Sequence, residues 1–175
     1  MLLKLKRTPG IYLVGFMGSG KSQAGRLLAD ELGWSFVDLD QDIEAAQGVP
    51  ISEIFDTHGE DEFRRIERQA LQKRVREIER GRPMVIAMGG GAYVSEANRA
   101  LLEERGVAIW LDCPFPRVCE RLKGATNRPL ARDPEKFQQL YHDRREPYGK
   151  ADFRIEADTD DASALVAAIL ALGIF

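Results

Sequence analysis

The strongest constraint in this 175-residue chain is the stretch GFMGSGKS at residues 15–22. It comes after the apolar run GIYLVG (residues 10–15) and precedes a helical pattern over residues 21–32. Its spacing matches GxxxxGK[ST], in which glycines turn several backbone N–H groups toward phosphate oxygens at the start of a helix. In such a loop Lys21 reaches the outer phosphates and the Ser22 hydroxyl ligates Mg²⁺. The stretch predicts nucleotide binding without naming a reaction.

Apolar runs alternate with helical patterns along the whole chain. This alternation is typical of a parallel sheet with helices on both faces, so we expect one α/β domain over residues 1–175. The expected strands cover residues 10–15, 35–40, 84–88, 107–112 and 152–158. The expected helices cover residues 21–32, the short QDIEAA segment, and residues 59–80, 95–105, 116–123, 134–146 and the tail from 160.

Charge and composition exclude several classes of protein. The net charge is −3 and the pI is about 5.5, whereas a general nucleic-acid binder is usually basic. The two cysteines, Cys113 and Cys119, form no CxxC pair and are expected to be small buried thiols. No apolar run reaches the roughly 18 residues of a membrane span, and MLLKLKRTPG is no signal peptide. We expect a cytoplasmic monomer without nucleic-acid or membrane partners.

The stretch KGATNRPLARDPEK (Lys123–Lys136) differs from the other connections. It is polar, contains a glycine and two prolines, and lies between two expected helices. It is too long for an ordinary connection, so it is either disordered or a mobile lid. Arg128 within it is suited to stabilising the charge that develops during phosphoryl transfer.

The segment FVDLD (Phe36–Asp40) places two carboxylates at the end of an apolar run, on the same side if the strand continues. Like charges this close repel, unless a magnesium ion offsets one and a bound hydroxyl occupies the other. A simpler alternative is that the pair caps the next helix. Asp112, at the end of VAIWLD, is a second candidate for the metal.

Three glycines come after another expected strand, in AMGGGAY (Ala87–Tyr93). A plain tight turn rarely needs three glycines, whereas a backbone that a ligand approaches closely does.

The run FVDLDQDIEAAQGVPISEIFDTHGEDEFRRIERQAL, with GFMGSGKS before it and GGGAY after it, closely resembles shikimate kinase. NRPL and RREPY, further along the chain, fit the same family. The resemblance extends from about Gly10 to the last helix. It implies a five-stranded parallel sheet of the nucleoside monophosphate kinase type. It also implies ATP-dependent phosphorylation of the 3-hydroxyl of shikimate, in the route to chorismate and the aromatic amino acids.

The resemblance also implies roles for individual residues. The expected catalytic residues are Lys21, Asp40 and Arg128. Asp38 and Ser22 would hold Mg²⁺, and Asp40 would hold the shikimate hydroxyls. The expected ATP-binding residues are Gly18, Ser19, Gly20, Lys21, Ser22, Gln23, Arg121 and Arg128, with Arg121 against the adenine. The expected shikimate-binding residues are Asp40, Arg64, Gly89, Gly90, Gly91 and Arg145, with the two arginines on the carboxylate.

Only the resemblance selects Arg64 over Arg65 and Arg68, or Arg145 over Arg144, because most arginines on charged helices are solvated. The chain also departs from the family pattern. Gln23 stands where threonine is usual, and REP is followed directly by a tyrosine rather than by another residue and then a tyrosine. Residues 157–161 match the family's adenine loop poorly, so the sequence singles out none of them.

Two other functions remain as alternatives. Another small-molecule kinase with the same loop, for gluconate or a nucleoside monophosphate, would not need the paired aspartates, the arginine helix and the three glycines together. A non-catalytic nucleotide-binding module would have lost Lys21, Asp40 or Arg128, and all three are present. The expected reaction is an in-line attack of the acceptor hydroxyl on the γ-phosphate, with Asp40 accepting its proton late.

Overall fold

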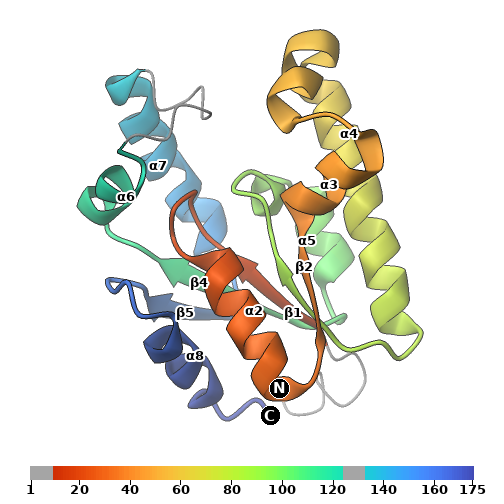
Figure 1. Ribbon diagram of the computed structural model, residues 1–175, viewed down its shortest axis with the longest axis vertical. Helices are drawn as coiled ribbons and strands as arrows, with labels where there is room; N and C mark the ends of the chain where they lie inside the picture. Colours follow the sequence, from red (N-terminus) through yellow and green to blue (C-terminus); the bar gives the residue numbers. More distant parts are fainter. Residues whose placement is uncertain (1–9, 124–132) are drawn as a thin grey trace.

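A five-stranded parallel sheet forms the centre of the computed structural model, which describes residues 10–123 and 133–175 (Figure 1). The strand order is β2-β3-β1-β4-β5. The strands are β1 (Gly10–Val14), β2 (Ser35–Asp38), β3 (Met84–Ala87), β4 (Val107–Asp112) and β5 (Phe153–Glu156). Every residue of β1, β3 and β4 is buried, as continuous apolar strands covered on both faces require. The predicted α/β class and five-stranded parallel sheet are confirmed.

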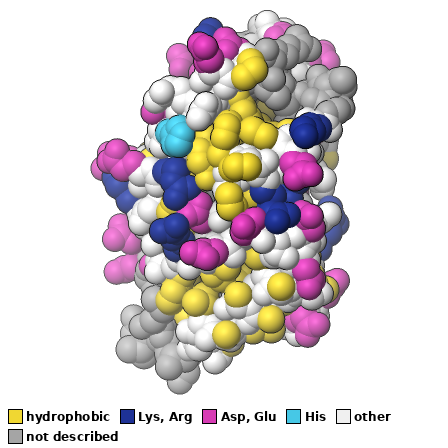
Figure 2. Space-filling model, turned by 90° about the vertical axis from the view of Figure 1, so that its left-hand side faces the viewer, with side chains coloured by type: hydrophobic (Ala, Val, Ile, Leu, Met, Phe, Trp, Pro, Cys, Tyr) yellow, Lys and Arg dark blue, Asp and Glu magenta, His cyan; other side chains and the backbone are white. Residues whose placement is uncertain are grey.

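The helices cover both faces of the sheet (Figure 1). Helices α2 and α8, which contact each other, lie on one face, and α4, α5 and α7 lie on the other (Figure 1). Figure 2 shows the side of the molecule formed by α6, α7 and α8, where basic and acidic side chains lie intermixed between apolar areas. The helical elements are α2 (Lys21–Leu32), α3 (Leu39–Gln47), α4 (Ile51–Glu79), the 3₁₀ turn η1 (Ala92–Val94), α5 (Glu96–Leu102), α6 (Phe115–Arg121), α7 (Pro134–Tyr148) and α8 (Ala162–Leu170).

Two element boundaries differ from the sequence prediction for local reasons. Helix α4 (Ile51–Glu79) consists of two helical segments that meet at Gly59, whose φ of 81° and ψ of 173° are not helical; the segment after Gly59 was predicted, and the segment before it was not. Strand β2 ends at Asp38, whose carboxylate accepts the backbone N–H of Gln41 at 3.2 Å and so starts α3. Asp40 therefore lies in the first turn of a helix and not in a strand.

Part of the predicted lid lies outside the described residues. The lid was expected over residues 123–136, and residues 124–132, which include Arg128, are not described. Among the helices that are described, none combines the length and the apolar character needed to cross a lipid bilayer.

The close packing of α2 against β2 depends on Gly25. A Cβ atom on Gly25 would lie only 2.5 Å from a ring carbon of Phe36 in β2. This approach brings the start of α2 next to the end of β2, where the Ser22 hydroxyl donates a hydrogen bond to the Asp38 carboxylate. A helix packed further away would separate these two groups.

We expect Gly25→Ala to destabilise the protein by about 1–3 kcal/mol, although alanine is the better helix former. The reason is the overlap of the new methyl group with Phe36. Asp30→Ala, at an exposed position of the same helix, is the control and should change stability by less than about 0.5 kcal/mol. Chemical denaturation measures both, and equal effects of the two substitutions would contradict the packing argument.

Candidate active site

The loop between β1 and α2 forms a site for an anion. The Lys21 ammonium folds over it and donates hydrogen bonds to the carbonyl oxygens of Gly15 at 2.7 Å and Phe16 at 2.9 Å. Gly20, the N-cap residue of α2, has a left-handed φ of 92° and has no side chain to cap the helix. The positive end of the helix thus faces the loop together with a lysine, a chemistry that fits phosphate. Ser19 is fully buried within this loop.

Ser22 and Asp38 place a hydroxyl and a carboxylate together beside that loop. Ser22 Oγ donates a hydrogen bond to Asp38 Oδ2, while Asp38 Oδ1 caps α3. The capping role and the metal role proposed from sequence are therefore compatible, because they use different oxygens. Hydroxyl and carboxylate oxygens are the donors that Mg²⁺ prefers, so these residues fit the ion. Gln23 is exposed on α2.

Asp112, the alternative metal ligand, is already bound by cations. Its Oδ1 accepts Arg145 Nη1 at 2.6 Å, and its Oδ2 accepts Arg145 Nη2 at 3.0 Å. Arg154 Nη2 also lies 2.6 Å from Oδ2. Two guanidinium groups on one buried carboxylate disfavour a further cation, so the contacts favour Ser22 and Asp38 for the metal.

Charged side chains press against each of the three glycines after β3. A Cβ atom would lie 2.6 Å from Asp40 Oδ1 if built on Gly89, 3.0 Å from Arg144 Nη1 if built on Gly90, and 2.6 Å from Arg64 Nη1 if built on Gly91. A larger residue at any of these positions would push the charged side chain away from the backbone. We call Asp40, Arg64, Glu67 and Arg144 the charged cluster, since all four gather around Gly89–Gly91.

The charged cluster adjoins the phosphate loop. The Cβ built on Gly90 would lie 3.8 Å from the backbone nitrogen of Met17, which belongs to that loop. The Arg144 guanidinium also stands 5.7 Å from the ring centroid of Phe16 in the same loop. A ligand on the cluster and a phosphate in the loop would therefore be neighbours, as a transfer between them requires.

The kinked helix α4 supplies Arg64 and its buried partner Glu67. Arg64 Nη1 lies 2.9 Å from Glu67 Oε1, and the Glu67 side chain is only 1% exposed. Burial raises the pKa of Glu67, while the adjacent Arg64 opposes the rise. Arg65 and Arg68 are exposed and bind Glu62 and Asn98 instead, so the structure brings only Arg64 of the three to the glycines.

The structure does not bring Arg145 to the glycines. Arg145 binds Asp112, and its neighbour Arg144 occupies the place by Gly90 where Arg145 was expected. Tyr148 explains the difference, because it lies one helical turn after Arg144 and donates a 2.5 Å hydrogen bond to the Gly90 carbonyl. Burial raises the pKa of Tyr148 to about 12, so it remains a donor. The REP motif led to Arg145, whereas the four-residue spacing between Arg144 and Tyr148 was the signal that indicates Arg144.

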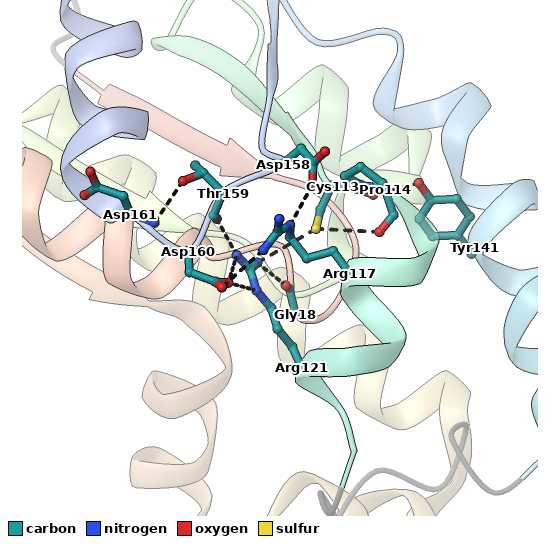
Figure 3. A network of polar contacts seen from close by, with 10 residues as sticks. All are labelled: Gly18, Cys113, Pro114, Arg117, Arg121, Tyr141, Asp158, Thr159, Asp160 and Asp161. Atoms are coloured by element: carbon teal, nitrogen blue, oxygen red, sulfur yellow. Dashed lines mark hydrogen bonds and ion pairs between the residues drawn. The ribbon is translucent and has the colours of Figure 1, made fainter.

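Arg121, expected against the adenine, joins the phosphate loop to the segment after β5 (Figure 3). Its Nη1 donates to the Gly18 carbonyl at 2.6 Å, and its Nη2 donates to the Thr159 carbonyl at 2.5 Å. Arg121 also pairs with Asp160, which Arg117 binds from one turn earlier on α6. The sequence had singled out no residue in this segment, because its contacts come from α6 rather than from a local motif.

Both cysteines are free thiols. Cys113 is buried, as expected, whereas Cys119 is only half-buried. Burial raises the pKa of the Cys113 thiol.

Glu67→Gln should gain thermal stability relative to the unaltered protein as the pH rises from 4.5 through the raised pKa of Glu67. A raised carboxyl pKa means that ionisation is harder in the folded chain than in the unfolded one, so the ionised form costs stability at the higher pH. Melting temperatures of both proteins across this pH range measure the effect.

Glu62→Gln is the matched control on the same helix. The hydrogen bond from Arg65 lowers the pKa of Glu62, so its contribution is stabilising above the unfolded pKa and is lost as the pH falls. The Glu62→Gln difference should therefore run in the opposite direction and be small at this solvent-accessible site. A Glu67→Gln difference that does not vary with pH would contradict the role of burial.

Comparisons with known proteins agree on one family. The family model for shikimate kinase matches residues 17–172. Shikimate kinases from Sulfurihydrogenibium sp. and Persephonella marina are 42% and 40% identical over 91% of this chain, and the matches cover 95% and 96% of those proteins.

Solved structures extend the comparison to three dimensions. The shikimate kinase of Acinetobacter baumannii in complex with shikimate has a TM-score of 0.88 and 35% identity, covering 98% of this chain and 96% of that one. A gluconokinase from Sinorhizobium meliloti, at 20% identity and a TM-score of 0.58 over 94% of this chain and 91% of its own, shares the fold alone. As its motifs predicted, the chain belongs to the shikimate kinase family.

Proposed function

We propose that this chain transfers the γ-phosphoryl group of ATP to the 3-hydroxyl of shikimate, with the charged cluster as the acceptor site. One observation carries the assignment: two arginines and an aspartate meet on three glycines directly beside the phosphate loop. Shikimate combines a carboxylate with hydroxyl groups, and this set of side chains matches both. The shikimate-bound relative from Acinetobacter baumannii supports the same acceptor.

The arginines and the aspartate bind different groups of the acceptor. Arg64 and Arg144 bind the carboxylate, because a guanidinium offers two parallel donors to its two oxygens. Glu67 holds Arg64 in place through its 2.9 Å contact. Asp40 accepts a hydrogen bond from the acceptor hydroxyl and orients it toward the phosphate loop. Gly89, Gly90 and Gly91 leave the space in which these groups converge.

The nucleotide occupies the loop and the start of α2. Lys21 binds the outer phosphates, and Arg121 contacts the base from its position between Gly18 and Thr159. Ser22 and Asp38 hold Mg²⁺, which neutralises charge on the phosphate oxygens when it is bound. The other proposed nucleotide contacts are made by Gly18, Ser19, Gly20, Gln23 and Arg128.

The reaction is an in-line displacement at the γ-phosphorus. The acceptor oxygen forms the new O–P bond while the bond to the ADP oxygen breaks, and the hydroxyl proton passes to Asp40 late in the step. Lys21 neutralises charge on the phosphoryl oxygens throughout, and the proposal gives Arg128 the same task. Catalysis is then mainly positioning and charge stabilisation by residues already in place.

The proposal includes a cytoplasmic monomer whose partners are shikimate and ATP. The acidic net charge of −3 supports small-molecule rather than nucleic-acid ligands.

ADP release tests the proposed reaction. The purified protein receives ATP and Mg²⁺ with shikimate, quinate, gluconate, AMP or CMP, or with no acceptor, and a further arm omits Mg²⁺. We expect release with shikimate in the presence of Mg²⁺. Release with gluconate or a nucleoside monophosphate alone would replace the acceptor, and ATP binding without release would favour a non-catalytic module.

Arg144→Ala should raise the KM for shikimate roughly 10- to 100-fold, because it removes a charged hydrogen-bonding partner of the carboxylate. The KM for ATP should change little. Arg65→Ala removes an exposed arginine outside the charged cluster and is the control, with both constants within about twofold. An unchanged shikimate KM in Arg144→Ala would remove Arg144 from the acceptor site.

A further inference from the structure

A second group of charges lies at the end of β4, where Asp112 meets Arg145 of α7. Asp112 is 8% exposed, and both of its oxygens are bound by Arg145. Arg154 from β5 binds the same carboxylate from a position that is 55% exposed. Both guanidinium groups also lie over the Trp110 ring, with Cζ 4.9 Å from its centroid for Arg145 and 5.1 Å for Arg154. Asp112 thus joins β4, β5 and α7.

Helix α7 has two functional faces near its end. Arg144 and Tyr148, four residues apart, lie against Gly90. Tyr141 and Arg145, also four residues apart, lie against the end of β4, where Tyr141 Oη donates to the Cys113 carbonyl at 2.7 Å. Arg145 Nη1 closes this second face by donating to Tyr141 Oη at 3.0 Å.

The last turn of α7 has less backbone support than an ordinary helical turn. Pro147 lies inside the helix and has no N–H to donate to the carbonyl four residues earlier. Arg144, Arg145 and Tyr148 flank this weakened position. The orientation of the turn therefore depends on side-chain contacts, and the two hydrogen bonds from Arg145 to Asp112 are the charged ones among them.

Stability alone is a weak reason to keep such a group of charges. Taking a carboxylate and a guanidinium out of water costs about as much as their attraction returns, and an apolar replacement is often no worse. A bidentate pair does, however, fix the relative position of its two elements. Because Arg144 is the neighbouring residue on the same helical turn, the pair also fixes the direction of the Arg144 side chain.

We propose that Asp112 is a positioning residue for the acceptor: by fixing Arg145, it orients the last turn of α7 and holds Arg144 and Tyr148 on Gly90. The inference rests on the proposed function, since it gives Asp112 a role in binding the shikimate carboxylate without contact to it. It also separates the adjacent arginines into two tasks, with Arg144 on the ligand and Arg145 on the scaffold.

Asp112→Asn, which keeps the shape and removes the charge, tests the proposal. We expect the KM for shikimate to rise about tenfold, the scale of a small misplacement of a binding group. The kcat and the KM for ATP at saturating Mg²⁺ should stay within about twofold. Calorimetric titration with shikimate should show the same loss of affinity without turnover.

Two comparisons separate positioning from general damage. Arg154→Gln removes the exposed partner of Asp112 on β5 and should leave the shikimate KM within about twofold. In an Arg144→Ala background, Asp112→Asn should have no further effect on this constant, because residues that act through one another are not additive. If Asp112→Asn does not fold, Arg145→Lys keeps the charge, loses the bidentate geometry, and should show the same selective rise.

The opposing outcomes are distinct. A higher Mg²⁺ requirement with an unchanged shikimate KM would assign Asp112 to the metal. A lower melting temperature with unchanged kinetics would make its role purely structural, and a full tenfold effect in the Arg144→Ala background would exclude the route through Arg144. Absence of shikimate-dependent ADP release by the unaltered protein would overturn the proposed function itself, whereas unchanged constants in the variants would overturn this inference alone.

Discussion

The common direction of the parallel strands is the constraint on which the site depends. Because β1 to β4 all point the same way, their carboxyl ends and the loops attached to them meet at one edge of the sheet. The phosphate loop comes after β1, Asp38 ends β2, the glycines come after β3 and Asp112 ends β4. Groups far apart in the chain thus become neighbours, and the helices that connect the strands account for their separation in sequence. An antiparallel strand among these four would carry its group to the opposite edge.

Charge pairing decides what each of these groups is free to do. Glu67 is buried and pairs with Arg64, which keeps one guanidinium beside the glycines rather than in solvent. Asp112 is nearly as buried, but two arginines bind its carboxylate, which disfavours a further cation there. Asp38 differs from both, since its oxygens meet only neutral donors in the described contacts, the Ser22 hydroxyl and a backbone amide. The identity of the partner, rather than burial alone, distinguishes these carboxylates and makes Asp38 the one proposed for the metal.

The fold was largely predictable, and the errors in its prediction have local causes. Strand and helix types depend on apolar runs and helical spacing, which need no knowledge of the partner elements. The prediction began a helix at Gly59, where the backbone does leave the helical conformation, but it missed the separate helical segment that precedes this glycine in α4. Asp40 was predicted to lie in a strand because the two-residue spacing between Asp38 and Asp40 fits strand periodicity. Asp38 instead caps α3, which begins at Leu39, two residues before the predicted start at Gln41. Strand and helix compete locally for these residues, and the cap favours the helix.

By itself, the sequence determined the nucleotide loop, the order of strands and helices, and the family, because these depend on residues close together in the chain. Ser22 and Asp38 could be paired in advance because the resemblance assigned both of them to Mg²⁺. The tertiary structure alone decided between Arg144 and Arg145. Adjacent residues of a helix point about 100° apart, so which of them faces the glycines depends on how α7 is rotated against β4. That rotation is a property of the packed molecule, and the four-residue spacing of Arg144 and Tyr148 becomes informative only once Tyr148 is seen to bind Gly90.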